Sequence, residues 1–398
     1  MLSGKTVVIG VCGGIAAYKI VEVVSRLRKL NAEVCVIMTD NAAEFVTPLT
    51  FQSISHNPVV TEMFEKPSNW DIEHITLARK ADLVLIAPAT ANVIGKIANG
   101  IADNMLTTVI MATKAPVLFV PAMNTAMYDN PILQENISKL KKFGYGFLNT
   151  EEGLMACGTV GKGRLPDPSV IVNRIIDILY SPKDMTKVKV MITAGPTWEA
   201  IDPVRYISNH SSGKMGYAIA EAAALRGAEV SLISGPVSID VPFNVKRVDV
   251  NSAEEMYNEV MQNYEKNEII IMVAAVADYK CSQISDKKIK KTENDMSISL
   301  KRNPDIAKEL GKVKGKRILV GASAETNDLV SNARSKLDSK NLDMIIANDV
   351  TMEGAGFGVD TNIVKIIKRD GMLLEFPLMS KKELAHKILD EVMSIYRI

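Results

Sequence analysis

The feature that most constrains the fold is a strand followed by a small-residue loop and a helix, which begins near residue 5 and again near residue 189. In the second half, the strand KVMITA leads through a polar loop over residues 205–216 into a helix and then the strand EVSLIS. In the first half, the strand TVVIGV meets the turn Cys12-Gly13-Gly14 and then a helix over residues 16–30. Such loops direct free backbone N–H groups at an anion. The chain therefore predicts two tandem nucleotide- or flavin-binding α/β units.

The other strands are predicted by continuous apolar runs, with segments of helical spacing between them. Continuous runs are typical of parallel sheets that are covered on both faces. We therefore predict an α/β fold of two tandem doubly wound, mostly parallel Rossmann-like domains, the first of them flavodoxin-like. The segments TNIVKII and MLLEFPL, separated by KRDG, predict a β-hairpin near the end. The further predicted strands are 83–89, 117–123, 268–279, 317–326 and 342–350, and a second helical pattern covers 93–113.

A short polar segment, SPKDMTKV, marks the boundary between the halves. It follows a predicted helix over residues 170–180. The length of 398 residues fits two or three domains of about 100–200 residues each. We predict a first domain over 1–180, a linker over 181–187 and a second domain over 188–398, each able to fold alone.

Charge and cysteine content argue against several classes of protein. The chain has 47 basic and 46 acidic residues and a net charge of +1, which disfavours a general nucleic-acid or membrane-surface role. Four cysteines are too few for a disulfide scaffold. No signal peptide is visible, and no apolar run approaches the roughly 20 residues that span a bilayer. We therefore expect a cytoplasmic protein with neither nucleic-acid nor membrane partners.

Four segments are predicted to meet at one edge of the first sheet, because ligands of open α/β sheets bind outside the C-terminal ends of the strands. These segments are residues 12–19, 38–42, 87–92 and 121–127. Small residues and backbone donors dominate them, as a site for a flat phosphorylated cofactor requires. One Gly-Gly turn is weak evidence, whereas four such strand ends together are considerably stronger.

Three residues near this edge each have a functional and a structural interpretation. His74 lies on a predicted helix, where an isolated histidine is a satisfied or surface residue about four times in five. Asn124 follows a strand and Pro121, and its structural alternative is a helix cap. Cys157 lies in a glycine-dense segment, residues 151–168, without strand or helix periodicity. A buried structural cysteine belongs on an apolar face, so a flexible lid with a reactive or proton-donating thiol is the better interpretation.

The second half contains candidate groups for an anion and a nucleotide. Asn209 and Lys214 precede a predicted helix, and a phosphate cradle and a solvated, capped loop are equally supported there, since the segment is neither a Walker loop nor GxGxxG. Asp278 is predicted to end a buried strand, at a position suited to a nucleotide ribose or a metal. Residues 286–291 carry four lysines, although such a run is a solvated face roughly three times in four. Lys336 and Lys340 lie one helical turn apart.

These motifs together resemble a known family. Residues 9–19, IEHI, APATAN, PAMNTAM and ACGTVGKGR look like the flavoprotein cysteine decarboxylases, while DPVRYISNHSSGKMG and KIKK look like phosphopantothenate–cysteine ligases. Over essentially the whole chain, the sequence is similar to the bifunctional coenzyme A biosynthesis family, which joins phosphopantothenoylcysteine decarboxylase to that ligase. PAMNTAM and ACGTVGKGR are both long and uncommon, and they occur in the order of the family.

The resemblance implies an FMN-dependent decarboxylase in residues 1–180. It assigns His74 as the base, Asn124 as the residue that holds the substrate carboxylate or amide, and Cys157 as the proton donor to the product. Two positions depart from the family: Cys12 stands where Ser is common beside the flavin phosphate, and Tyr128 stands where many members have Trp. The implied FMN-binding residues are Gly13, Gly14, Thr39, Pro88, Ala89, Thr90 and Asn92.

The resemblance also implies a ligase in residues 188–398, which joins 4′-phosphopantothenate and cysteine with CTP through an acyl-cytidylate. Asn209 would contact phosphopantothenate or its acyl-cytidylate, Lys288 would stabilise charge during attack on that intermediate, and Asp278 would hold Mg²⁺. Ala322 replaces a Phe that is frequent in the family, so ATP in place of CTP stays open. The implied CTP-binding residues are Ala274, Asp278, Lys288, Asn303, Pro304, Asp305, Ile306, Ala322, Lys336 and Lys340.

Kinship further implies a homo-oligomer with trimeric flavin domains, FMN at a subunit interface and dimeric ligase domains. Two alternatives compete with this function. A flavin prenyltransferase-like or peptidyl-cysteine decarboxylase fused to an unrelated nucleotide domain is disfavoured by DPVRYISNHSSGKMG and KIKK. A flavin-binding regulatory subunit would be attractive if His74 or Cys157 were missing, and both are present.

Overall fold

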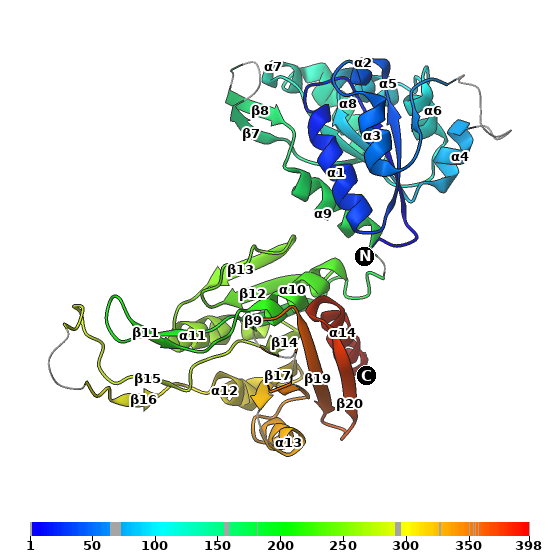
Figure 1. Cartoon of the computed structure of the whole chain (residues 1–398). Helices are drawn as coiled ribbons and strands as arrows, with labels where there is room; N and C mark the ends of the chain where they lie inside the picture. The colour runs from blue at the N-terminus through cyan, green and yellow to red at the C-terminus, as the bar shows by residue number, and fades with distance from the viewer. Residues whose placement is uncertain are drawn as a thin grey trace. The chain divides into compact units, whose positions relative to one another are not determined.

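Two α/β units, Met1–Tyr180 and Ser181–Ile398, make up the computed structural model of the chain (Figure 1). Each unit contains its own large sheet. None of the helices in the described part of the chain combines the length and the hydropathy of a membrane-spanning segment. The described residues are 2–63, 73–154, 158, 160–180, 182–290, 296–325, 328–349, 351–352, 354, 356 and 358–397.

The first unit is built on a six-stranded sheet in the order β3-β2-β1-β4-β5-β6, in which every neighbouring pair is parallel. Without the two-residue edge strand β3, this is the order of a flavodoxin-like sheet. The winding reverses between β1 and β4, which is the position where such sheets bind ligands. The strands are β1 (Thr6–Val11), β2 (Glu33–Met38), β3 (Val59–Val60), β4 (Leu83–Ala89), β5 (Val117–Pro121) and β6 (Gly146–Phe147).

Helices cover both faces of this sheet. On one face α1, α3 and α9 pack together, and on the other α4, α5, α6 and α8 bury Val84, Ile86 and Phe119. Because both faces are covered, β1 and β4 are buried at every position, in agreement with their continuous apolar runs. The helices are α1 (Ala17–Lys29), α2 (Asp40–Ala43), α3 (Pro48–Ser55), α4 (Glu73–Lys80), α5 (Ala91–Ala98), α6 (Met105–Ala112), α7 (Thr125–Tyr128), α8 (Pro131–Lys142) and α9 (Pro168–Leu179).

Residues 93–113 form two helices, so the prediction of one continuous helical segment there is wrong. α5 ends at Ala98, and α6 begins again after Asn104. Asn104 Oδ1 accepts a hydrogen bond from Thr107 N at 2.9 Å, and Thr107 Oγ1 accepts one from Asn104 N at 3.2 Å. This reciprocal cap satisfies two orphan N–H groups at a helix start, so the second helix starts independently and Asn104 lies in a loop.

The prediction that residues 151–168 lack strand structure is also wrong. β7 (Glu151–Leu154) and β8 (Val160–Arg164) form a two-stranded antiparallel ribbon. Glycines at 153, 161 and 163 hide the alternation of side chains that identifies a strand. Cys157 belongs to the connection between these strands, and it lies outside the described residues.

The second unit has an eight-stranded sheet in the order β13-β12-β9-β14-β17-β18-β19-β20. Neighbours are parallel from β13 to β18, whereas β19 and β20 are antiparallel. Both the tandem doubly wound fold and the C-terminal hairpin are thus confirmed. The strands are β9 (Lys189–Ala194), β12 (Glu229–Ser234), β13 (Val245–Asp249), β14 (Ile269–Met272), β17 (Ile318–Glu325), β18 (Met344–Asp349), β19 (Thr361–Lys368) and β20 (Leu373–Ser380).

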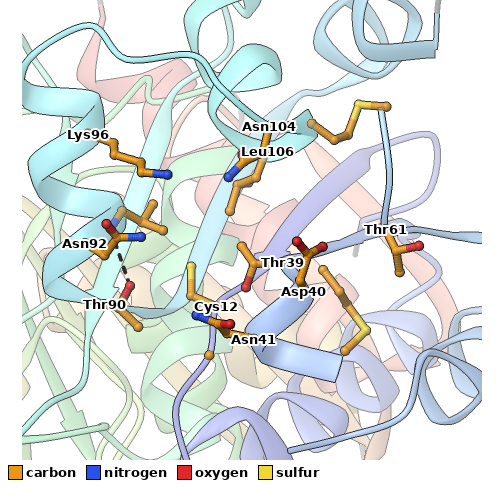
Figure 2. A pocket seen from close by; sticks show the side chains of 14 residues that line it. Cys12, Thr39, Asp40, Asn41, Thr61, Thr90, Asn92, Lys96, Asn104 and Leu106 are labelled. Carbon is orange, nitrogen blue, oxygen red and sulfur yellow. Dashed lines mark hydrogen bonds between the residues drawn. The ribbon is translucent and has the colours of Figure 1, made fainter. Parts of the chain in front are cut away.

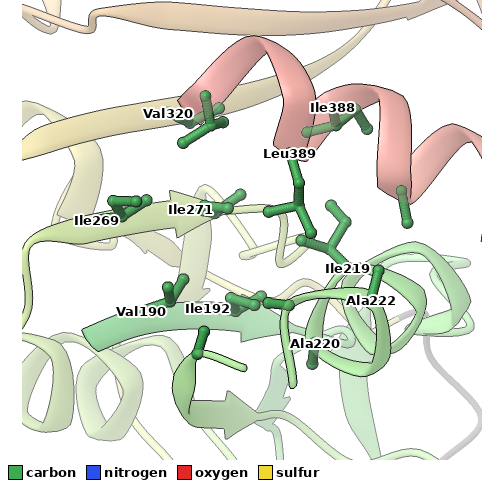
Figure 3. Packing of buried hydrophobic residues seen from close by; sticks show 14 of the residues in the cluster. Val190, Ile192, Ile219, Ala220, Ala222, Ile269, Ile271, Val320, Ile388 and Leu389 are labelled. Atoms are coloured by element: carbon green, nitrogen blue, oxygen red, sulfur yellow. The ribbon is translucent and has the colours of Figure 1, made fainter. Parts of the chain in front are cut away.

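Successive residues of the central strands of this sheet enter opposite cores. Ile192 and Ile271 pack with α10 and α14 (Figure 3), whereas Met191 and Ile270 pack on the face of α11, α12 and α13. Each such side chain stabilises the fold by about 1.5–3 kcal/mol when it is fully buried, so both faces require apolar residues. The helices are α10 (Lys214–Leu225), α11 (Ala253–Asn263), the 3₁₀ helix η1 (Tyr264–Lys266), α12 (Ile306–Val313), α13 (Leu329–Ser339) and α14 (Lys381–Tyr396).

The strand predicted over residues 268–279 is wrong beyond Met272, where β14 ends. Thr193 Oγ1 accepts hydrogen bonds from the N–H groups of Val273 and Ala274, both at 3.2 Å, and Thr197 Oγ1 accepts one from Ala277 N at 3.0 Å. Side chains therefore replace the sheet as partners of these three N–H groups, whereas Ala275 N donates to the backbone oxygen of Gly195. Two small antiparallel ribbons complete the unit: β10 (Trp198–Ala200) with β11 (Tyr206–Ser208), and β15 (Tyr279–Cys281) with β16 (Leu300–Arg302).

The segment predicted as a linker is anchored to the second unit. The Asp184 carboxylate accepts hydrogen bonds from the Arg226 guanidinium at 2.8 and 2.6 Å. Met185 N donates to Arg226 O at 3.0 Å, and the Met185 side chain is fully buried. Arg226 also binds Asp390 of α14 at 2.8 Å. The contacts of the second unit therefore begin before residue 188.

We expect a fragment of residues 181–398 to be more stable than one of residues 188–398. The shorter fragment leaves Arg226, which is 4% exposed, with Asp390 but without Asp184, and loss of a hydrogen bond to a charged group costs about 1.5–3 kcal/mol. Urea unfolding of both fragments, with Asp184→Asn in the longer one and Pro182→Ala as an exposed control, measures the difference. Equal free energies of unfolding for the two fragments would contradict this account.

The same pair predicts a pH dependence. Hydrogen bonds from Arg226 hold the pKa of Asp184 below its usual range. The stabilisation from Asp184 is therefore fully present above the unfolded pKa of about 4, and it is lost as the pH falls through the lower folded-state pKa. Asp184→Asn should flatten the acid limb of the stability curve of the 181–398 fragment.

Candidate functional site

A pocket of about 240 Å³ lies at the C-terminal ends of β1, β2 and β4, where the winding of the first sheet reverses (Figure 2). It contains four of the predicted FMN residues: Gly13, Thr39, Thr90 and Asn92. Gly14, Pro88 and Ala89 do not line it, although a Cβ on Gly14 would lie 4.0 Å from Pro88 Cγ. The lining residues are Cys12, Gly13, Met38, Thr39, Asp40, Asn41, Thr61, Thr90, Asn92, Val93, Lys96, Asn104, Met105 and Leu106.

The pocket has the features of a cradle for a phosphorylated planar ligand. Gly13 approaches Asn41 so closely that a Cβ on Gly13 would lie 2.4 Å from Asn41 Cβ. Thr39 Oγ1 is buried without a hydrogen-bond partner. Thr90 caps α5 and accepts a hydrogen bond from Val93 N at 3.4 Å, so a helix N-terminus also borders the pocket. An orphaned hydroxyl, a close-approaching backbone and a helix N-terminus together fit an anionic ligand.

Cys12 contributes a neutral thiol to this pocket. Its side chain is labelled among the lining residues in Figure 2. Burial raises the pKa of Cys12 to about 12, against a smaller lowering by a hydrogen bond from the Thr90 backbone. A thiol with so high a pKa is not a nucleophile at neutral pH, and it is a weak hydrogen-bonding group. Cys12 therefore shapes the pocket without adding charge.

Two polar residues outside the four predicted segments, Lys96 and Asn104, also line the pocket. Lys96 Nζ binds Asp103 Oδ2 at 2.6 Å, which orders the lysine side chain. A sequence signal for Asn104 exists, because an Asn before an apolar run is a typical helix cap. Lys96 has no such signal, since its place beside the pocket depends on how α5 packs.

Of the predicted catalytic residues that the structure describes in the first unit, neither His74 nor Asn124 lines this pocket. His74 is half-buried near the start of α4 and is not among the lining residues. Asn124 caps α7, with its Oδ1 accepting a hydrogen bond from Ala126 N at 2.9 Å, so the helix-cap interpretation describes its observed contact. Cys157 lies outside the described residues.

The β7–β8 ribbon docks on the loop that carries Asn124. Met123 N donates to Gly163 O at 2.9 Å. A Cβ on Gly163 would lie 2.3 Å from Met123 O, and a Cβ on Gly161 would lie 2.6 Å from Thr125 Oγ1. The backbone of β8 therefore rests directly on residues 123–125. This contact places the ribbon that leads to Cys157 beside Asn124.

In the second unit, loops meet where the winding of the sheet reverses between β9 and β14. Asn209 Nδ2 donates to Ala275 O at 3.0 Å, and Ala275 N donates to Gly195 O at 2.9 Å. The loop that follows β9 is thus tied to the segment that follows β14. This is the edge at which doubly wound sheets bind ligands, and it includes Asn209 and Ala274 of the predicted site.

Asn303 attaches a third loop to the same segment. Asn303 Nδ2 donates to Ala277 O at 2.9 Å, and Asn303 N donates to Asp278 O at 2.8 Å. The Oδ1 atom of Asn303 is buried and has no hydrogen-bond partner. Asp278 is exposed and directly precedes β15. The structure therefore joins Asn209, Asp278 and Asn303 through one backbone segment.

The remaining predicted CTP residues come from α12, β17 and α13. Asp305 caps α12 by accepting a hydrogen bond from Lys308 N at 3.1 Å, and it binds Lys340 Nζ at 3.0 Å. Ile306 is 3% exposed and packs in the core, so only its backbone can face a ligand. Pro304 immediately precedes Asp305, Ala322 is exposed on β17, and Lys336 lies in the last turn of α13.

Lys214, at the start of α10, is paired with the segment that precedes β19. Its Nζ donates to Asp360 Oδ1 at 2.7 Å and to Gly358 O at 2.8 Å. Lys214 accordingly holds the pKa of Asp360 below its usual range. The lysine at the start of α10 thus anchors residues 358–360.

Lys288 lies in an exposed loop that is attached to the turn at residues 201–205. Asp202 Oδ2 accepts a hydrogen bond from Ile289 N at 3.1 Å, and Arg205 Nη2 donates to Ile289 O at 3.0 Å. Hydrogen bonds from Arg205 hold the pKa of Asp202 far below its usual range. The motif DPVR contributed to the family resemblance, but its contact with Ile289 has no sequence signal.

Candidate metal ligands do not cluster in the part of the chain that the structure describes: no group of three or more His, Cys, Asp or Glu side chains could hold an ion there. A lone carboxylate such as Asp278 does not build a metal cage. It does suit Mg²⁺, which usually keeps several waters and binds through one or two carboxylates together with substrate phosphates.

Comparisons with known proteins cover both units. Residues 1–180 match the family model described as flavoprotein, and residues 185–396 match the DNA/pantothenate metabolism flavoprotein C-terminal domain. The coenzyme A biosynthesis bifunctional protein CoaBC of Bacillus subtilis (strain 168) is 50% identical over 99% of this chain and 98% of that protein. This chain belongs to the CoaBC family. The CoaBC protein of Haemophilus influenzae is 46% identical over 100% of this chain and 99% of its own.

A solved structure, the C-terminal domain of a CoaBC protein, is 41% identical and covers 54% of this chain and 99% of that chain, with a TM-score of 0.47. Membership of the CoaBC family makes this chain a bifunctional enzyme of coenzyme A biosynthesis, with decarboxylase and ligase activities. The full-length match overturns the two alternatives, a decarboxylase fused to an unrelated nucleotide domain and a regulatory subunit.

We expect Gly163→Ala to detach the β7–β8 ribbon from residues 123–125, whereas the control Gly144→Ala should not. Both glycines have positive φ, +119° and +89°, so both substitutions add backbone strain of about 1–3 kcal/mol. Only Gly163 has atoms within 4 Å of the new Cβ. Tryptic cleavage at Lys162 and Arg164 should therefore accelerate in Gly163→Ala alone. Equal cleavage in both variants would show that the ribbon is not held by this contact.

Proposed function

We propose that the chain joins 4′-phosphopantothenate to cysteine with CTP and then decarboxylates the product with FMN, which yields 4′-phosphopantetheine. Residues 1–180 carry the decarboxylase and residues 188–398 carry the ligase, with the anchored segment 181–187 between them. The observation that carries the proposal is the position of the two candidate sites. Each lies where the winding of its own sheet reverses, one with a glycine–threonine cradle and the other with three joined loops.

In the first unit, Gly13, Thr39, Thr90 and Asn92 would hold FMN, and the orphaned Thr39 hydroxyl would gain a partner. When bound, FMN supplies the oxidation of the cysteinyl thiol and the later reversal of that oxidation. Removal of CO₂ needs this redox chemistry, because the substrate carboxylate otherwise has no adjacent electron sink. Lys96, ordered by Asp103, would add positive charge beside the ligand.

The chain itself would handle the substrate and its protons. His74 would take the proton of the substrate thiol, and Asn124 would bind the substrate carboxylate or amide. After CO₂ has left, Cys157 would give a proton to carbon of the enethiolate. The capped position of Asn124 on α7 and the docked ribbon that leads to Cys157 support this pairing.

In the second unit, the carboxylate of phosphopantothenate would attack the α-phosphate of CTP and release pyrophosphate. Negative charge builds up during this step, and preorganised cations such as Lys340 and Lys336 would offset it. Asp278 would hold Mg²⁺, which supplies further positive charge to the phosphates when it is bound. The amine of cysteine would then attack the acyl-cytidylate beside Asn209 and Lys288, so that an amide forms and CMP leaves.

We also propose that the chain forms homo-oligomers, with trimeric flavin units and dimeric ligase units. His74 does not line the pocket of its own unit, as expected where the FMN site lies at a subunit interface. In the second unit, the two ribbons expose apolar side chains, which are unusual on a free surface when they gather. They are Trp198, Tyr206, Tyr279 and Leu300, and the rings of Trp198 and Tyr206 stack at 4.3 Å. A cytoplasmic location, and the lack of nucleic-acid and membrane partners, stay predictions.

The decarboxylase assignment predicts different blocks for two variants. His74→Asn should retain FMN and ligation but release no CO₂. Cys157→Ser should release CO₂ and accumulate the enethiol, because an alcohol is far less acidic than a thiol of pKa about 8.5. Single-turnover mass spectrometry with CO₂ detection separates these outcomes. Normal decarboxylation by His74→Asn would remove His74 from the mechanism. Normal turnover by Cys157→Ser would show that Cys157 is not the proton donor and that the β7–β8 ribbon only covers the site.

The ligase assignment predicts that Lys288→Gln blocks ligation far more than Lys287→Gln. Both lysines are exposed neighbours, so they contribute equally to a diffuse positive field. A side chain that stabilises developing charge contributes roughly 100-fold or more to the rate, and its loss should persist at high salt. Cysteine-dependent release of CMP from CTP measures the step assigned to Lys288, and comparison with release of AMP from ATP tests the consequence of Ala322. Equal, salt-sensitive losses in both variants would indicate that the lysines act through their combined positive charge and not through one positioned side chain.

A further inference from the structure

The turn at residues 201–205 encloses a carboxylate that has no exposed atoms, Asp202. Its Oδ1 accepts hydrogen bonds from the N–H groups of Val204 and Arg205, both at 2.9 Å. Its Oδ2 accepts one from Arg205 Nε at 3.0 Å. Buried charges are tolerated in proteins when they are paired and hydrogen-bonded in this way. The turn is therefore rigid around an ionised Asp202.

The same ion pair also forms hydrogen bonds with a loop that is distant in sequence. Ile289 N donates to Asp202 at 3.1 Å, and Ile289 O accepts from Arg205 Nη2 at 3.0 Å. Ser285 N adds a third bond, to Ile201 O at 3.1 Å. Both backbone polar groups of Ile289 are thus held by one charged pair. Ile289 is half-buried, whereas Lys288 is exposed beside it.

The lysine-rich loop needs such an anchor. Residues 282–290 contain neither helix nor strand, and Lys287, Lys288 and Lys290 repel one another. A segment of like charges does not keep one conformation unaided, and ordering each residue costs about 1–2 kcal/mol of conformational entropy. Fixing the backbone of Ile289 removes part of that cost before any ligand binds.

The anchor is also connected to the substrate side of the site. The turn at 201–205 runs directly into β11, and Asn209 follows β11. Asn209 in turn binds Ala275, in the segment that leads to Asp278. One continuous stretch of chain therefore holds Ile289 at its start and reaches the predicted phosphopantothenate and CTP residues at its end.

We propose that Asp202 and Arg205 are positioning residues that hold Lys288 in place for the ligase step. This inference rests on the proposed role of Lys288. The pair acts through the backbone of Ile289 and needs no contact with substrate. Misplacement of a reacting group by about 1 Å costs roughly 100-fold in rate, so a loop that is free to move should lower turnover more than affinity.

The test is Asp202→Asn in the full chain. The substitution keeps the size of the side chain. It can replace the acceptor Oδ2 with an NH2 group, which cannot accept hydrogen bonds from Arg205 and Ile289. We expect ligation turnover to fall roughly 10- to 100-fold, with the CTP concentration for half-maximal rate nearly unchanged. Amide hydrogen exchange of residues 285–290 should rise. Asp240→Asn, at an exposed carboxylate of the same unit, should change neither quantity.

A double variant separates positioning from a general structural role. If Asp202 acts through Lys288, Asp202→Asn combined with Lys288→Gln should be no slower than Lys288→Gln alone. A further loss in the double variant, with a lower melting temperature, would overturn the proposal. Arg205→Lys keeps the charge but loses the guanidinium fork, so it should also raise exchange at 285–290 and serves if Asp202→Asn does not fold.

The outcomes also separate this proposal from the ligase assignment. Suppose that Lys288→Gln blocks ligation while Asp202→Asn changes neither ligation nor hydrogen exchange. The positioning role of Asp202 and Arg205 is then wrong, whereas the proposed role of Lys288 in ligation stands. If exchange rises in Asp202→Asn but neither variant slows ligation, the proposed role of Lys288 is wrong, and the positioning proposal is overturned with it.

Discussion

Burial of parallel strands on both faces is the constraint on which the rest of the structure depends. Ile192 and Met191 are consecutive residues of β9, yet they enter two different cores, so neither face of the sheet is available for a ligand. The only part of such a sheet that remains accessible is its edge, where strands end and loops begin. Both candidate sites lie at that edge, each where the winding reverses.

At these edges, side chains take over the hydrogen bonding that the sheet no longer supplies. Thr193 and Thr197 accept from the N–H groups that follow β14, and Asn303 donates to Ala277 O in the same segment. In the first unit, the Asn104–Thr107 cap starts α6 beside the pocket. Buried backbone groups must find partners, so these short polar side chains decide the path of the loops that form each site.

Ion pairs, unlike these hydrogen bonds within the loops of each site, attach segments that are far apart in the chain. Arg226 holds Asp184 and Asp390, Lys214 holds Asp360, and the Asp202–Arg205 pair holds Ile289. Exposed ion pairs contribute little to stability, but several of these include a buried group and backbone hydrogen bonds as well. Besides any contribution to stability, each fixes the position of a boundary or a loop that lacks a core of its own.

The sequence by itself determined the features that depend on contiguous residues. Continuous apolar runs predicted the central strands of both sheets but not the edge strands β3, β6 and β13. TNIVKII and MLLEFPL predicted the hairpin, and long motifs such as PAMNTAM identified the family. Periodicity of apolar residues reports only how one segment is buried. Predictions from it were therefore wrong where polar side chains or glycines interrupt a segment, which occurs at Asn104, in the β7–β8 ribbon and after Met272. Only the tertiary structure decided that Asp184 belongs to the second unit, that Lys96 borders the pocket, and that Asp202 binds Ile289. Those contacts join residues distant in sequence, and nothing local to either partner specifies which segments the fold brings together.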